Sequence, residues 1–155
     1  MKKRLMVIGI VLVLLLTMST TVNAKVEREP FVAVGITLEI LNPGKVFLSD
    51  GNMHIRGMVE RVRTECDDDR IEGWHTIIAN NNLNAEEYGR VWGTYDLAVD
   101  AYDGGWEGTM TGVTDENGIS LKMQGHGYGE LSGLKIEGTY LNGITSGVIV
   151  ASPND

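Results

Sequence analysis

Apolar and polar residues alternate along most of the chain, in short runs separated by turn residues. The alternation is cleanest over residues 31–41 and is typical of a half-buried strand, because successive side chains of a strand point to opposite faces. The residues predicted to face inward from this strand are Val32, Val34, Ile36, Leu38 and Ile40. The same pattern predicts further strands at residues 45–48, 53–63, 71–79, 89–100, 106–113, 119–126, 134–141 and 144–151.

The segments between these runs predict tight hairpins. Three of them contain a residue pair that two-residue hairpin loops favour, because both central positions need positive φ. These pairs are Asp50-Gly51, Asn117-Gly118 and Asn142-Gly143. Residues 80–84 interrupt the alternation, and Asn84 with Glu87 predicts a single capped helical turn. Eight or nine strands joined by consecutive short hairpins predict an all-β fold, an antiparallel up-and-down barrel.

Isolated glycines are frequent in the second half of the chain, where one short phrase recurs. WGTYDL, WEGTMTG and IEGTYL each place a Gly-Thr pair inside an alternating run between Trp92 and Gly147. Glycines inside strands mark bulges, bends or close backbone approach, and a sheet needs such points in order to curve and close. This stretch therefore predicts the second half of a closed barrel.

The first 24 residues have the composition of a secretory signal peptide. Basic residues at positions 2–4 precede an unbroken apolar run at 5–16, and Val22-Asn23-Ala24 ends on a small residue suited to cleavage. The apolar run is shorter than the roughly 20 residues that a membrane-spanning helix needs. We expect a signal peptide at 1–24, a single domain at 25–155, and a secreted or extracytoplasmic location. An uncleaved anchor is the alternative.

Charge and cysteine content narrow the range of partners. Without the three basic residues of the signal peptide, ten Lys and Arg face 21 Asp and Glu, a net charge of −11. This balance disfavours nucleic acid and anionic membrane surfaces as partners, and no stable membrane insertion is expected after cleavage. Cys66 is the single cysteine, so the domain has no internal disulfide, and its acidic neighbours favour a raised thiol pKa. Oligomeric state is left open.

No group of residues in the sequence predicts a metal, a cofactor or a catalytic site. His54, His75 and His126 lie in three separate predicted strands, and none has a second His or Cys at ligand spacing. The acidic run Asp67-Asp68-Asp69 lacks the spacing of an EF-hand loop and is read as a solvated loop. The chain also lacks a Gly-x-Ser-x-Gly elbow, a phosphate-binding loop and a Cys-x-x-Cys pair.

In one predicted strand, the alternation would place a charged side chain on the apolar face. Arg61 would share a face with Ile55 and Val59, which would place a charge inside the barrel unless a bulge at Gly57 shifts the register. A buried charge must be paired or serve a ligand. We favour the alternative in which Arg61 is exposed.

The last three hairpins, GHGYGELSGLKIEGTYLNGITSGVIV, resemble the closing hairpins of the allene oxide cyclase and dirigent-type barrels, which are calycin-like. The resemblance rests on glycine spacing and covers about the C-terminal third of the chain. It implies an antiparallel barrel whose apolar cavity binds small hydrophobic molecules. Neither family's catalytic motif matches, so the resemblance implies no catalytic residue.

Three functions follow as hypotheses. The preferred one is an exported barrel that binds a small apolar ligand without catalysis. The alternatives are a cyclase- or isomerase-type enzyme that uses the same cavity, and a packed structural or interaction module. If the barrel is hollow, the residues expected to line its ligand cavity are Tyr95, Leu97, Ile136 and Tyr140, because each lies on the apolar face of its strand.

Overall fold

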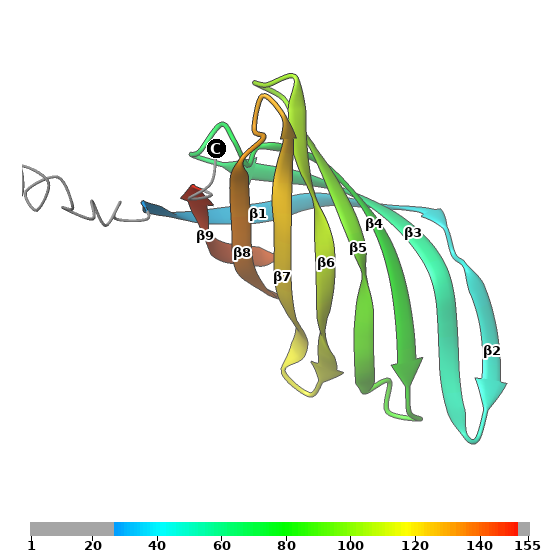
Figure 1. Cartoon of the computed structure of the whole chain (residues 1–155). Coiled ribbons are helices and arrows are strands. Elements are labelled where there is room, and N and C mark those ends of the chain that lie inside the picture. Colours follow the sequence, from blue (N-terminus) through cyan, green and yellow to red (C-terminus); the bar gives the residue numbers. More distant parts are fainter. Residues whose placement is uncertain (1–26, 152–155) are drawn as a thin grey trace, which may run out of the picture.

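The computed structural model describes residues 27–151, and within this range every regular element is a strand (Figure 1). The strands are β1 (Arg28–Asn42), β2 (Lys45–Ser49), β3 (Asn52–Cys66), β4 (Gly73–Leu83), β5 (Gly89–Val99), β6 (Gly104–Asp115), β7 (Gly118–Gly129), β8 (Leu134–Leu141) and β9 (Ile144–Ala151). All nine belong to one antiparallel sheet. The predicted all-β class is confirmed.

The sheet closes on itself. Consecutive strands pair from β2 through to β9, β9 pairs with the first half of β1, and the second half of β1 pairs with β3. Eight strands therefore form a ring with up-and-down connectivity, as predicted. β2 pairs only with the beginning of β3, so this hairpin extends beyond the ring (Figure 1).

The predicted inward face of β1 is wrong over its first half. Phe31 and Ala33 are buried, whereas Val32 and Val34 point outward and are exposed. A register shift between Gly35 and Thr37 inserts one extra residue. Such a bulge turns the following side chains to the other face. A strict period of two cannot anticipate that change.

Beyond the bulge, the β1 side chains that were expected inside do turn toward the ring. Ile36 and Leu38 line its interior, although both remain more than half exposed at the open end. Ile40 pairs with the inward-facing Glu60 and is exposed as well.

A second bulge, in β3, resolves the conflict at Arg61. The register shifts between Ile55 and Met58, and Gly57 between them has a φ of +67°. After this shift Arg61 lies on the outer face, with its guanidinium 4.4 Å from the centre of the Trp74 ring. The exposed position favoured for Arg61 is therefore confirmed.

The expected break at residues 80–84 is also wrong, because β4 continues to Leu83. The asparagine side chains that suggested a break are used at the β3 bulge. The Asn80 Oδ1 accepts from the Gly57 N–H at 3.1 Å, and the Asn82 Oδ1 accepts from Arg56 at 2.6 Å.

The predicted helical turn at Asn84 is a plain turn. The Asn84 Oδ1 accepts from the backbone N–H groups of Glu86 and Tyr88, as a capping residue would. Glu87, however, has a φ of +64°, which a right-handed helix excludes.

Two of the three predicted hairpin turns have the expected geometry. Asp50-Gly51 and Asn142-Gly143 have positive φ at both residues, as a type I′ turn requires. The third turn lies one residue earlier than predicted. Asp115 pairs with Gly118, so Glu116 and Asn117 form the loop, and only Gly118 has positive φ, at +104°.

Two apolar clusters lie inside the ring. The larger one is built around Trp106, which is fully buried, and the smaller one comprises Ala79, Val91, Met110 and Leu121. Glycines make room for the largest side chains. A Cβ on Gly125 would lie 2.5 Å from the Tyr95 hydroxyl, and a Cβ on Gly147 would lie 2.8 Å from the Phe31 ring. The Gly-rich strands therefore allow aromatic side chains to cross a narrow ring.

Candidate functional site

A cavity of about 310 Å³ occupies the ring beside the smaller apolar cluster. Every strand of the ring contributes to its wall. Most of the lining is apolar, and it includes Met58, Val62, Ile77, Ala79, Val91, Met110, Leu121 and Met123. Ile36, Leu38 and Ile119, which are partly exposed, stand at the open end. The cavity is therefore an apolar chamber whose mouth to solvent lies at this end.

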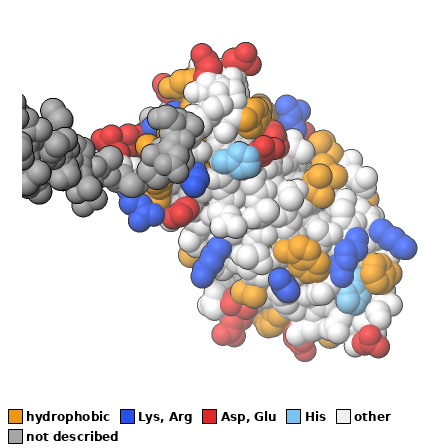
Figure 2. Space-filling model, in the orientation of Figure 1, with side chains coloured by type: hydrophobic (Ala, Val, Ile, Leu, Met, Phe, Trp, Pro, Cys, Tyr) orange, Lys and Arg blue, Asp and Glu red, His pale blue; other side chains and the backbone are white. Residues whose placement is uncertain are grey.

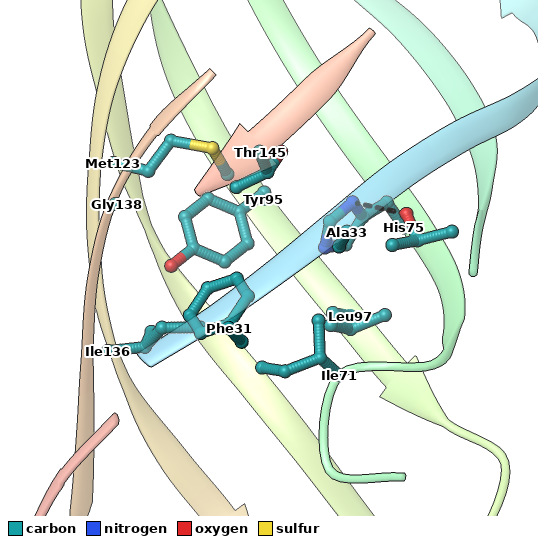
Figure 3. A pocket seen from close by; sticks show the side chains of 11 residues that line it. Phe31, Ala33, Ile71, His75, Tyr95, Leu97, Met123, Ile136, Gly138 and Thr145 are labelled. Carbon is teal, nitrogen blue, oxygen red and sulfur yellow. Dashed lines mark hydrogen bonds between the residues drawn. The ribbon is translucent and has the colours of Figure 1, made fainter. Parts of the chain in front are cut away.

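The four residues predicted to line a ligand cavity are divided between two places. Tyr95, Leu97 and Ile136 lie in the packed end of the ring, where a space of only about 20 Å³ remains (Figure 3). That volume holds about one water molecule. Tyr140 instead lines the larger cavity. All four side chains lie on the interior face of the ring, but the structure gathers only Tyr140 into the larger chamber.

Glu60 is the charged side chain that lines this cavity, and sequence reasoning missed it. Within the described residues its carboxylate has no hydrogen bond or ion pair, and burial raises its pKa above the usual range. The β3 bulge turns Met58, Glu60 and Val62 inward together. Met58 and Val62, the apolar residues two positions before and after Glu60, could have revealed its inward position, because they lie on the same face of the strand.

His75 lies between the packed end and the larger cavity and lines both. It is buried, its Nδ1 is 3.3 Å from the Thr64 hydroxyl, and its ring meets Tyr95 edge-on (Figure 3). Burial lowers its pKa to about 4, so the imidazole is neutral at physiological pH. It brings polarity to the cavity wall but no charge.

Asn81 adds a second polar group to the wall. Its Oδ1 is fully buried and has no hydrogen-bond partner among the residues described. Buried polar atoms are usually hydrogen-bonded, so this amide oxygen is an exception among the residues that surround the cavity.

The other candidates from the sequence are accounted for elsewhere on the molecule. His54 stacks on Phe47, and His126 pairs with Glu107 on the outer face. Asp68 is bound by Arg70, which holds the pKa of that carboxyl below its usual value. In the described part of the chain, no three His, Cys, Asp or Glu side chains gather as a metal site would require.

The Cys66 thiol has a raised pKa, in the predicted direction. Burial is the largest cause, and the charges of Asp68 and Asp67 add to it. The Cys66 Sγ donates to the Val32 carbonyl at 3.3 Å, so the thiol is held at the β1–β3 seam.

On the face shown in Figure 2, acidic and basic side chains are scattered among apolar ones.

No protein-family model, curated protein or solved structure matches this chain. Across residues 27–151 no helix is long and apolar enough to cross a membrane.

Proposed function

We propose that the protein is an exported binding protein for a small apolar molecule, which it holds inside the ring without chemical change. The observation that carries this proposal is the apolar cavity of about 310 Å³. This volume lies at the lower end of the roughly 300–1,000 Å³ typical of ligand pockets. The likeness to the allene oxide cyclase and dirigent-type barrels supports the same function, since their cavities hold small hydrophobic molecules.

The chemistry of the lining favours an apolar guest. Methionine, valine, isoleucine and leucine side chains make up most of the wall, and methionine adapts readily to irregular shapes. Transfer of apolar surface from water contributes about 25 cal/mol per Å² before association costs are subtracted. The packed-module alternative would leave such a chamber without a role.

Export completes the proposal. Residues 1–24, which lie outside the described range, have the order of a signal peptide, so the binding protein would act outside the cytoplasm. Intact-mass measurement of protein exported by a bacterial host should give a chain that begins at Lys25. A chain that retains Met1 to Ala24 would instead indicate an anchor.

The binding proposal can be tested with prodan, an uncharged fluorophore whose emission shifts in apolar surroundings. Residues 25–155 should bind prodan at one site. Ile119→Trp should weaken binding at least about tenfold by narrowing the mouth, since tenfold corresponds to about 1.4 kcal/mol. Val113→Trp, on the outer face of the neighbouring strand, is the matched control and should bind as the parent does. Absence of prodan binding by the parent would reject the proposal.

Glu60 favours a second candidate, the cyclase- or isomerase-type enzyme. A carboxyl group with a raised pKa inside an apolar cavity is suited to moving a proton. Mass spectrometry of lipophilic extracts, made from the parent and from Glu60→Gln, separates the two candidates. A binding protein should yield the same compound from both proteins, in equal or smaller amount from the variant. An enzyme should yield a product from the parent and its unconverted precursor from the variant.

A further inference from the structure

Among the described residues that line the cavity, Glu60 carries the carboxyl group. This group has no hydrogen bond or ion pair within the described part of the chain, and Thr64, Thr114, Tyr140 and Thr145 add neutral hydroxyl groups to the wall. Within residues 27–151 no Lys or Arg side chain lines the cavity, and the buried imidazole of His75 is neutral. The chamber therefore holds a carboxyl group, and among the described residues no cation of the lining balances its negative charge.

This arrangement is costly in the empty protein. A carboxylate withdrawn from water is unfavourable unless it is paired or hydrogen-bonded. The nearest neighbours of Glu60 across the sheet are Ile40 on β1 and Ile77 on β4, and neither can supply a donor from its side chain. A guest that carries a positive charge would supply the missing partner.

The same geometry argues against an anionic guest. A fatty-acid carboxylate in this chamber would meet Glu60 with like charge and would find no Lys or Arg among the described residues of the lining. The net charge of the domain acts in the same direction, because a strongly acidic protein attracts cations and repels anions.

We propose that the guest is an apolar amine, whose protonated nitrogen lies against the Glu60 carboxylate while its hydrocarbon part fills the chamber toward Met58 and Met110. This inference rests on the proposed function and names the chemical class of its ligand. An ammonium group donates up to three hydrogen bonds, and carboxylate and hydroxyl oxygens both accept them.

The test compares three molecules that share an eight-carbon chain: octylamine, octan-1-ol and octanoate. Each is used to displace prodan from residues 25–155 at about pH 8, where carboxyl groups are ionised and an alkylamine, with a pKa near 10.4, is protonated. Octylamine should displace prodan at concentrations roughly tenfold below those of octan-1-ol, and octanoate should be the weakest. The other titratable groups that line the chamber are His75 on β4 and Tyr140 on β8.

Glu60→Gln is the decisive variant, and it should fold, because it removes a desolvated charge and keeps the shape of the side chain. In this variant octylamine and octan-1-ol should become equal to within about threefold. Glu39→Gln removes a carboxylate from the exposed face of β1 and should keep the parent's preference.

The outcomes are distinguishable. A parent that binds prodan without preferring the amine, or a preference that survives in Glu60→Gln, would overturn the amine assignment and leave the binding function standing. A parent that binds neither prodan nor any of the three molecules would overturn both.

Discussion

Two titratable side chains inside the ring, Glu60 and His75, have pKa values moved in opposite directions by the same cause. Burial disfavours the charged form of each, so the pKa of the carboxyl rises and that of the imidazole falls. Neither side chain could be placed from the sequence alone. The alternating run around His75 does not show which of its two faces is buried, and the inward position of Glu60 depends on the bulge at Gly57.

His75 should make stability depend on acidity. Its pKa is 6.5 in the unfolded chain and about 4 in the folded one, so the unfolded state binds more protons in between. Its contribution is fully present above pH 6.5 and is lost as the pH falls toward 4, with a total of about 3 kcal/mol. Urea unfolding of residues 25–155 at several pH values measures this loss.

Two variants isolate the histidine from the many carboxyl groups that also titrate in acid. Between neutral pH and about pH 4, His75→Gln should lose distinctly less stability than the parent protein does. His126→Gln, at an exposed position on the outer face, should behave as the parent does. Identical acid dependence in all three proteins would contradict the buried, neutral state of His75.

At the scale of elements, turns were easier to predict than bulges. Asp50-Gly51 and Asn142-Gly143 announce their geometry locally, because positive φ at both positions restricts the residues that fit. For β3, Gly57 suggested a bulge but did not establish one. The bulge in β1 lies in its pairing with β3, which is not the next strand, so no local pattern encodes it. Val32 and Val34 were therefore assigned to the wrong face.

The Asn142-Gly143 turn allows a direct test of backbone strain. Gly143 has a φ of +95°, and a Cβ there would meet nothing within 4 Å, so any cost of substitution comes from the backbone alone. Gly143→Val should destabilise the domain by about 1–3 kcal/mol, because a β-branched residue resists this conformation. Gly143→Asn should cost less, since asparagine tolerates positive φ. Equal denaturation midpoints for the two variants would show that strain does not govern this turn.

The two ends of the ring should respond differently to added bulk. Ile136 is buried in the packed cluster, whereas Ile119 stands at the mouth of the cavity. Ile136→Trp should destabilise by about 1–3 kcal/mol through overpacking, and Ile119→Trp should cost clearly less. Thermal unfolding of both variants decides the matter. Equal losses would mean that the mouth is as tightly packed as the core.

For the whole molecule, strand order was predictable and cavity position was not. Short hairpins between alternating runs fix the up-and-down order, and recurrent glycines indicate closure. Which part of the interior is filled depends on how side chains from distant strands meet. Tyr95 and Phe31 fill one end of the ring over glycines, and the chamber is left at the other end, beside Met110. Tyr140 was therefore the only predicted lining residue in the larger cavity.

The central claim is that an apolar guest enters this chamber, and the methionines of the domain test it most directly. Residues 25–155 contain four, of which Met58, Met110 and Met123 line the cavity, while Met53 lies outside its lining on the β2–β3 hairpin. NMR of protein labelled with ¹³C at the methionine methyl groups should be recorded during titration with prodan, whose aromatic rings shift nearby signals. The signals of Met58, Met110 and Met123 should move together and saturate, while that of Met53 stays in place. Saturable binding that leaves these three signals unmoved, or that moves Met53 alone, would contradict a ligand site inside the ring.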